Sequence, residues 1–198
     1  LVRDILEASR LDAAGEGAAL AREPVDVAAA VRAAVAEVEP LARERGVTFE
    51  VRVEGEAEAA GGALGVAAEG AALADGDASA EGEASPLAAA PTALAAPDLL
   101  AKAIGIVVGN AALHAPAGST AVVRVGRGSL AVENPCGPLA PQDAAALCNP
   151  FARADASRAA ATGGTGLGLY LAKTICALHA FPFAVTVEDA TFRVEMLF

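Results

Sequence analysis

The residues best suited to chemistry form the stretch Gly163 to Gly168, GGTGLG, which directly precedes an apolar segment with helical spacing. Glycines let the backbone turn tightly and leave its N–H groups accessible. A helix that begins at such a turn adds partial positive charge. The stretch is therefore suited to holding an anion such as a phosphate group.

Three interpretations of this stretch remain open on its residues alone. A Walker A loop requires Lys and then Ser or Thr after the glycines, whereas Leu169 and Tyr170 follow here. A dinucleotide-binding fingerprint requires a buried strand directly before the glycines, and the polar residues 152–162 do not form one. The third interpretation is a glycine loop with a purely structural role.

The composition limits the partners of the chain. Its 198 residues include 14 Lys and Arg against 25 Asp and Glu, so the net charge is −11. Binding of nucleic acid without sequence preference requires clustered basic residues, so we exclude nucleic acid as a partner. The length predicts one main domain, because domains usually hold ~100–200 residues.

The cysteines and the apolar stretches exclude further classes. Cys136, Cys148 and Cys176 are odd in number and lack CxxC spacing, so we expect free thiols in a reducing compartment, with no disulfide framework or zinc site. The longest nearly apolar stretch, 87–108, is interrupted by prolines and charges and is not expected to span a membrane. The charged residues near the start exclude a signal peptide, and the initial Leu1 predicts a fragment.

Apolar periodicity predicts the elements that must position the glycine stretch. A long helix follows Asp26, its expected N-cap, and ends at Gly46. A second helix begins at Pro97, a favoured first helical residue, and ends near 115–118. The other predictions are strands at 18–23, 47–53, 87–94, 120–125 and 129–132, helices at 143–147 and 167–179, a closing hairpin over 185–198, and a helix at the start of the chain that ends near Gly15 and Gly17. Helices mixed with mostly antiparallel strands define the α+β class.

Residues 54–85 differ in composition from the rest of the chain. They consist largely of Ala, Gly and eight acidic residues, and no Lys or Arg occurs between Arg52 and Lys102. Long stretches without periodicity are usually lids, insertions or disordered segments. We interpret this stretch as a flexible acidic insertion between two strands, and the binding of a basic partner is the alternative.

Four segments together resemble the ATP-binding domain of sensor histidine kinases. In chain order they are LLAKAIGIVVGNAALHAPAG (99–118), VENPCGPL (132–139), NPFARADASR (149–158) and GGTGLGLYLAKTICALHA (163–180). They are similar to the N, G1, F and G2 boxes of these kinases, whose fold is shared with Hsp90, MutL and gyrase B. The resemblance implies a two-layer α/β sandwich of the Bergerat type that binds ATP and Mg²⁺.

The front of the chain resembles the same family. LVRDILEASRLD looks like the end of the second helix of the dimerisation domain. We therefore expect residues 1–17 to be the end of that helix and residues 18–198 to be the ATP-binding domain. The resemblance also implies a homodimeric parent that is anchored in a membrane, with this domain in the cytoplasm.

The N-box resemblance assigns roles to two residues of the helix that begins at Pro97. Asn110 matches the asparagine that holds the Mg²⁺ bridging the ATP phosphates, and an amide oxygen is a suitable ligand for this hard cation. His114 lies one turn later, where the family often has Tyr or His near the phosphates. The alternatives are an Asn that satisfies the backbone and a surface His at a helix end.

The G1 resemblance places Asn134 where the family normally has an Asp that accepts a hydrogen bond from the adenine amino group. An Asn oxygen can accept the same bond without the charge, so we expect a weaker contact. Cys136 and Pro138 replace two expected glycines, with Gly137 between them. The Asn-x-Cys pattern looks like a variant found in some sensor kinases.

The F and G2 boxes supply the remaining expected ATP-binding residues. Phe151 matches the phenylalanine at the base of the ATP lid, and Arg153 and Arg158 match lid arginines that can reach phosphates; solvated lid charges are the alternative. The G2 residues expected at the triphosphate are Gly164, Thr165, Gly166, Leu167 and Gly168. The glycines among them would let the lid hinge.

Several features of the family are missing. Ile106 stands where the N box usually has its first Asn, and Leu113 where Lys or Arg often meets a phosphate. The phosphoacceptor histidine lies upstream of Leu1, and neither His114 nor His179 has the neighbouring acid that the acceptor motif requires. The chain alone is therefore not expected to autophosphorylate in cis.

The sequence thus favours the catalytic domain of a two-component sensor histidine kinase, which transfers the ATP γ-phosphate to a histidine of its own dimerisation helix for passage to a response regulator. Two alternatives stay open. One is a degenerate module that keeps the fold and serves as an interaction domain. The other is a different ATPase of the same superfamily.

Overall fold

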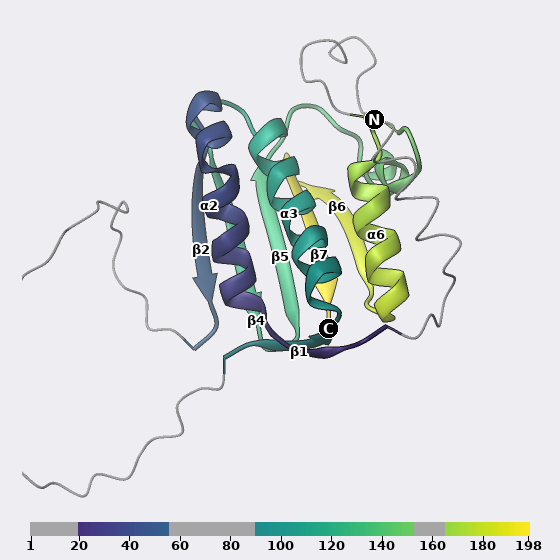
Figure 1. Cartoon of the computed structure of the whole chain (residues 1–198). Coiled ribbons are helices and arrows are strands. Elements are labelled where there is room, and N and C mark those ends of the chain that lie inside the picture. The colour runs from purple at the N-terminus through teal and green to yellow at the C-terminus, as the bar shows by residue number, and fades with distance from the viewer. Residues whose placement is uncertain (1–19, 56–89, 153–164) are drawn as a thin grey trace, which may run out of the picture.

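Three helices cover one face of a five-stranded sheet in the computed structural model, which describes residues 20–55, 90–152 and 165–198 (Figure 1). The helices are α2 (Val27–Arg45), α3 (Pro97–His114) and α6 (Gly168–His179). The strands of the sheet are β2 (Thr48–Val53), β4 (Thr120–Gly126), β5 (Ser129–Pro135), β6 (Phe183–Glu188) and β7 (Thr191–Leu197). The two layers are those expected from the sequence.

The strand order in the sheet is β2-β4-β5-β7-β6. β2 runs parallel to β4, and the other neighbouring pairs are antiparallel. This mixed but mostly antiparallel sheet confirms the predicted α+β class. The strands alternate between an apolar face under the helices and a polar open face, which is the pattern of a sheet covered on one side.

Local signals in the sequence determine the bounds of α2. The carboxylate of Asp26 accepts a hydrogen bond from the backbone N–H of Ala29 at 2.9 Å, which satisfies one of the unpaired donors of the first turn. The helix ends at Gly46, whose φ of 68° lies in the left-handed region that glycine adopts without strain. Both predicted ends are confirmed.

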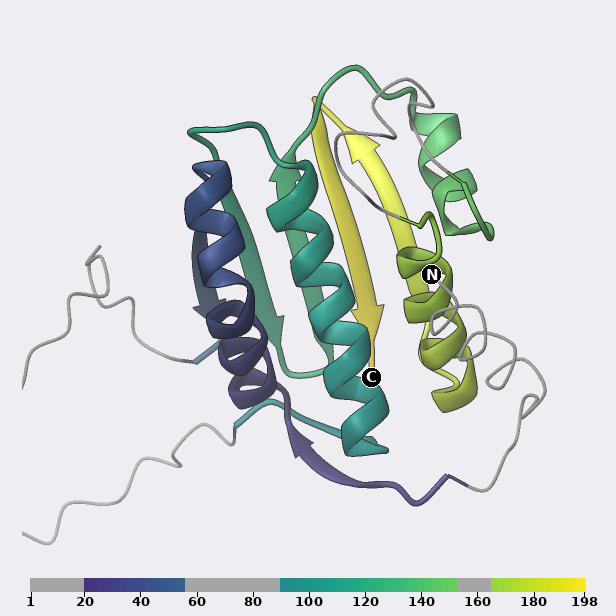
Figure 2. The same cartoon turned by 45° about the horizontal axis from the view of Figure 1, so that its top comes forward.

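Helix α3 begins at Pro97 as predicted and lies between α2 and α6. Its apolar residues are buried on the sheet: Leu100, Ala103, Ile104, Val107, Val108, Ala111 and Ala112. α6 runs antiparallel to α3, because the C-terminal residue of α6, His179, reaches the backbone N–H of Ala96 at the start of α3 (Figure 2). The two helices therefore pack against each other along most of α6.

The predicted hairpins are confirmed. β4 and β5 pair up to Gly126 and Ser129, which leaves a two-residue turn between them. β6 and β7 are joined by Asp189 and Ala190, whose φ values of 47° and 56° are those of a type I′ turn. This turn joins β7 to β6, the strand at one edge of the sheet.

Three predicted elements differ from the structure. The strand expected at 87–94 begins only at Thr92 and ends at Ala95, and residues 87–89 lie outside the described ones. The strand expected at 18–23 instead occupies Glu23–Asp26 (β1), because these residues pair antiparallel with Thr92–Ala95 (β3) in a separate two-stranded sheet. The short helix expected at 143–147 is one helical turn at Pro141–Ala144 (α4) followed by a 3₁₀ turn at Ala145–Cys148 (η1). The predicted helix at 1–17 lies outside the described residues. The predicted insertion at 54–85 does so as well, apart from Glu54 and Gly55.

The open face of the sheet carries charged side chains that pair across strands. Glu133 on β5 accepts hydrogen bonds from Arg124 on β4 and Arg193 on β7, and Arg193 also donates to Glu195. The thiols of Cys136, Cys148 and Cys176 are free, as predicted. No helix within the described ranges combines the length and apolar character that crossing a membrane would require.

Candidate functional site

Asn110 lies on the flank of α3 that faces α6. Ile106 precedes it by one turn on the same flank, and its Cγ2 atom lies 3.4 Å from the position that a Cβ on Gly168 would take. α6 begins at Gly168 and runs away from this end of α3 (Figure 2). Asn110, one turn further along α3, therefore lies near the level at which α6 begins.

Asn134 lies at the end of β5 and faces the helix layer. It follows Leu130 and Val132 in the alternation of the strand, and both of these are buried in the core. Asn134 is itself only 2% exposed, although its side chain is polar. Its Nδ2 donates a hydrogen bond of 2.8 Å to the carbonyl oxygen of Pro135.

An apolar wall stands next to Asn134. Phe192 on β7 is its direct cross-strand partner, and Val187 on β6 is in turn paired with Phe192. Side chains of directly paired residues share a face of the sheet, so both apolar groups lie on the helix side. α3 packs on β5, the strand that carries Asn134. This end of the layer thus combines a polar acceptor with apolar surfaces, which is the usual construction of a small-molecule site.

The backbone around Gly166 meets the backbone around Phe151. A Cβ on Gly166 would lie 2.9 Å from the carbonyl carbon of Phe151 and 3.0 Å from the carbonyl oxygen of Ala152, so only glycine fits without a shift. The φ of Gly166 is 70°, and that of Phe151 is 63°. The phenylalanine ring is 59% exposed. This contact joins the G2 region to the F-box residue.

The start of α6 offers unpaired backbone donors. Leu167, the N-cap residue, makes no side-chain cap, and its own N–H points to the Thr165 hydroxyl at a long 3.4 Å. The first N–H groups of a helix have no partner within the helix, and they carry its partial positive charge. The N–H groups of Leu167 and Gly168 therefore lie at the positively charged end of α6, close to Ile106 of α3.

The other predicted residues have less defined surroundings. His114 is exposed at the end of α3, where the carbonyl of Leu113 accepts a hydrogen bond from Arg45 at 3.3 Å. A Cβ on Gly137 would meet nothing within 4 Å, so this glycine lies in open space. Arg153, Arg158 and Gly164 lie outside the described residues.

Cys136 lies two residues after Asn134 and is partly buried. Partial burial raises the pKa of its thiol above the ordinary value, so the group stays protonated and is no strong nucleophile at neutral pH. Within residues 20–55, 90–152 and 165–198, no three His, Cys, Asp or Glu side chains gather as a metal site. The donor set at this end is made of neutral amides and backbone N–H groups, which fits a nucleotide that supplies its own charged oxygens for a Mg²⁺ ion.

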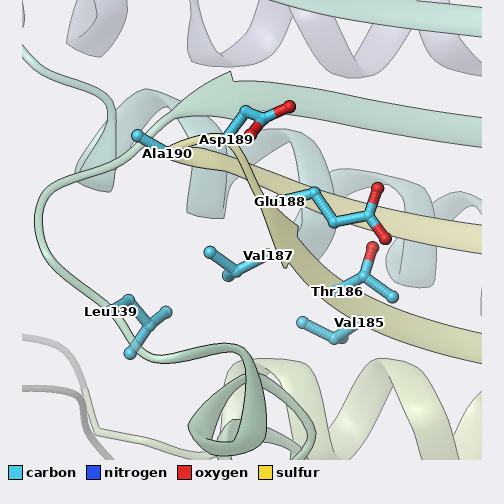
Figure 3. Close-up of a pocket in the computed structure, with 7 residues that line it drawn as sticks. All are labelled: Leu139, Val185, Thr186, Val187, Glu188, Asp189 and Ala190. Carbon is cyan, nitrogen blue, oxygen red and sulfur yellow. The ribbon is translucent and has the colours of Figure 1, made fainter.

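A separate pocket lies at the β6 edge of the sheet (Figure 3). It has a volume of about 690 Å³ and is lined by Leu139 and by residues 185–190 of β6 and the following turn. None of the predicted ATP-binding residues lines it. Its connection to the site is through the backbone, because the N–H of Cys136 donates to the carbonyl of Ala190 at 2.8 Å. This bond fixes the turn that follows Asn134.

The sequence and the fold together define the class of this protein. Residues 95–197 match the family described as histidine kinase-, DNA gyrase B- and HSP90-like ATPase. The match covers more than half of the chain, and the chain belongs to this family.

The curated proteins that the chain resembles include sensor histidine kinases. The chain is 36% identical over 94 residues to the sensor histidine kinase CusS of Escherichia coli strain K12, across 46% of this chain and 20% of that protein. It is 38% identical over 85 residues to the sensor-like histidine kinase SenX3 of Mycobacterium tuberculosis strain H37Rv, across 41% of this chain and 21% of that protein. The chain thus spans about a fifth of the length of the curated relatives it matches.

Solved structures agree on the fold. The mycobacterial sensor histidine kinase MprB superposes with a TM-score of 0.59 at 19% identity, covering 88% of this chain and 95% of that one. Full-length ShkA in complex with AMPPNP gives 0.66 at 21% identity, covering 98% of this chain and 34% of that one. The catalytic domain of the histidine kinase ThkA gives 0.62 at 13% identity, covering 90% and 96%. The fold is that of histidine kinase catalytic domains.

Two contributors to the site were missed by the sequence. Ile106 was noted only as a lost Asn, whereas its side chain lies against Gly168 where α3 and α6 meet. The carbonyl of Pro135 was not considered, although it orients the amide of Asn134. Backbone atoms leave no signal in side-chain patterns, so the second contact could not be found without coordinates.

Proposed function

We propose that this chain binds Mg²⁺ and ATP between α3, the end of β5 and the start of α6, and donates the γ-phosphate to a histidine on the dimerisation helix of a sensor histidine kinase. One observation carries the proposal. Two amide side chains, Asn110 and Asn134, lie at the same end of the molecule as the N-terminus of α6. Membership of the ATPase family supports the proposal that this end of the molecule binds ATP.

The adenine base fits the sheet side of the site. The Oδ1 of Asn134 would accept a hydrogen bond from the 6-amino group, and Phe192 would provide an apolar surface for the ring. The Asn contact lacks the charge of the Asp that the family usually carries, so we expect modest affinity.

The triphosphate fits the helix side. The N–H groups at the start of α6 would donate to phosphate oxygens, as helix N-termini commonly do. Asn110 would hold the Mg²⁺ through its amide oxygen, with the phosphates as the other ligands. The ion would neutralise charge that develops on the phosphates during transfer.

The transfer itself requires a second group. An imidazole nitrogen of the acceptor histidine would form a bond to the γ-phosphorus while the bond to the bridging oxygen of ADP breaks. The contribution of this domain is to hold the phosphate in line and to stabilise its charge. The acceptor, the dimer partner and the response regulator that receives the phosphate belong to the proposed parent protein.

Calorimetry tests the proposal. The wild-type chain should bind an ATP analogue in a saturable, Mg²⁺-dependent manner, and Asn110→Ala should lose the Mg²⁺-dependent part of the affinity. Lys102→Gln, two turns earlier on the same helix, serves as the matched control and should bind as the wild type does. Absence of binding at millimolar nucleotide would contradict the proposal.

A second candidate is a module that keeps this fold as an interaction domain. The observation that favours it is Ile106, which places an apolar side chain against Gly168 beside the expected Mg²⁺ position. Cys136 and Pro138, which stand for glycines of the G1 box, favour it as well. This candidate predicts no nucleotide binding, so the same titration separates the two.

A further inference from the structure

β6 forms one edge of the sheet, because β7 is its single neighbour among the described strands. The N–H of Leu197 on β7 donates to the carbonyl of Pro182 at 3.0 Å, so these two residues form a hydrogen-bonded pair. Hydrogen-bonded and non-hydrogen-bonded pairs alternate along an antiparallel ladder. Val185 and Val187 therefore belong to non-hydrogen-bonded pairs, and their backbone N–H and C=O groups point outward from the sheet. No hydrogen bond joins these groups to another residue of the described ranges.

The pocket of about 690 Å³ lies directly beside this free edge (Figure 3). The buried side chains of Val185 and Val187 face Leu139 across the pocket, whereas the exposed Thr186 and Glu188 lie on the other side of the strand. α4 and η1 also contact β6. The volume lies within the range of pockets that hold small ligands. The free edge thus faces a space that can hold a few residues of an extended chain.

Two carboxylates stand at one end of the pocket. Glu188 is the last residue of β6 and Asp189 the first residue of the turn, and both are exposed and line the pocket. Neither forms an ion pair with a described residue, whereas Glu133 and Glu195 on the open face of the sheet pair with arginines. The net charge of −11 adds to the negative potential. The pocket therefore favours a positively charged occupant.

We propose that β6 accepts an extended basic segment of a partner protein as an additional strand. The backbone of the segment would pair with the outward N–H and C=O groups of Val185 and Val187, as in other cases of strand addition. Its apolar side chains would enter the pocket beside Leu139, and its Lys or Arg side chains would lie near Glu188. Successive side chains of a strand point to opposite faces, so the segment is expected to alternate apolar and basic residues.

Fluorescence anisotropy with the labelled peptide Lys-Val-Lys-Val-Lys tests the proposal on the full chain. The peptide should bind saturably, and it should protect the N–H groups of Val185 and Val187 from hydrogen exchange. Glu-Val-Glu-Val-Glu should bind at least about tenfold less tightly, because it brings like charges together. Val-Val-Lys-Lys-Lys has the same composition as the first peptide without its alternation and should also bind less tightly.

A pair of proline variants tests the backbone contact. Val187→Pro removes an outward N–H and leaves the hydrogen bonds to β7 in place, so it should weaken peptide binding about tenfold. Val51→Pro is the matched control on β2, the other edge of the sheet. The N–H groups of Thr48 and Glu54 donate toward β4, so that of Val51 points outward as well. This variant should bind the peptide as the wild type does.

A pair of charge variants tests the choice of a basic partner. Glu188→Lys should weaken binding of the Lys peptide, because it replaces an attraction with a repulsion. Glu37→Lys makes the same change at an exposed position of α2, on the side of the molecule away from β6, and should leave binding unchanged (Figure 1).

Three outcomes would overturn the proposal. One is peptide binding that leaves hydrogen exchange at Val185 and Val187 unchanged, and another is equal binding of the Lys and Glu peptides. The third is protection of the same two N–H groups that grows with protein concentration in the absence of peptide, which would assign the edge to a second copy of the chain. The exchange measurement uses the wild-type chain, so it decides between these outcomes even where Val187→Pro fails to fold.

Discussion

Two buried polar side chains, one at each end of the helix layer, differ in how completely they are paired. His179, at the end of α6, is 2% exposed and uses both ring nitrogens: Nε2 accepts from the N–H of Ala96 at 3.0 Å, and Nδ1 donates to the carbonyl of Ile175 at 2.7 Å. Asn134, at the opposite end, is equally buried but pairs only its amide nitrogen. A buried group with all its hydrogen bonds made within the protein has a structural role, whereas one with a bond left to make can bind a ligand.

The surroundings of the two residues agree with this distinction. The His179 ring stacks on Phe181, which in turn meets Phe198 edge to face, each with ring centroids 5.2 Å apart. The imidazole supplies a partner to Ala96, the N-cap residue of α3, whose methyl side chain cannot cap the helix. The end of the helix layer that holds His179 is therefore a structural junction of α3, α6 and the C-terminal residues. Among the described residues, only the carbonyl of Pro135 pairs with the Asn134 side chain at the opposite end.

Removal of His179 should produce the largest effect and should act on stability alone. His179→Ala leaves a cavity and an unpaired Ala96 N–H, so we expect a loss of about 3 kcal/mol in the free energy of unfolding, measured by urea titration. Lys173→Ala, on the exposed face of the same helix, should change it by less than about 0.5 kcal/mol. Nucleotide affinity of the folded variant should stay at the wild-type value, and a specific loss of binding would break the comparison.

The same contrast shows what the sequence can reveal. The ends of α2 and the start of α3 were predicted because Asp26, Gly46 and Pro97 act through local geometry. β1 was misplaced because its pairing partner, Thr92–Ala95, lies far along the chain beyond the acidic stretch. Strand pairing of this kind depends on distant residues, which local patterns do not encode.

The site shows the same limit. Asn110 and Asn134 were proposed as site residues from box order, but nothing in the sequence indicated that Pro135 orients one of them. His179 was considered only as a phosphoacceptor, because its partner Ala96 is 83 residues away. Motifs therefore identify which residues matter, and coordinates are needed to say which of their atoms are free.

At the end of the molecule where α6 begins, Gly166→Ala should be the most destabilising substitution of a glycine. The new Cβ would lie under 3.0 Å from the backbone of Phe151, and the φ of 70° is strained for alanine. We expect a loss of about 2 kcal/mol, measured by thermal or urea unfolding. Gly105→Ala provides the control of opposite sign, since a Cβ there meets nothing within 4 Å and helix propensity improves. Equal effects of the two would contradict the tight contact at Phe151.

Alkaline pH should lower the free energy of unfolding through Cys176, a buried residue of α6. Burial raises the pKa of this thiol to about 12, so the unfolded chain, with an ordinary thiol, loses its proton first as the pH rises. Stability from this group is complete below the unfolded pKa and falls by up to about 1.4 kcal/mol per pH unit between the two pKa values. Urea titrations at pH 8, 9 and 10 should show this slope, and Cys176→Ala should reduce it; an identical slope in the variant would count against a buried thiol.

The smallest effect on stability is expected at Asn134, and it tests the comparison most directly. Asn134→Ala removes one hydrogen bond to Pro135, a residue exposed enough for water to replace the donor, so the loss should be at most about 1 kcal/mol. Nucleotide affinity should fall clearly in the same variant, because the open acceptor is gone. His179→Ala and Asn134→Ala would then separate stability from binding in opposite directions. If Asn134→Ala instead lost as much stability as His179→Ala while nucleotide binding stayed unchanged, Asn134 would have a structural role only. The proposed nucleotide site would then not include it.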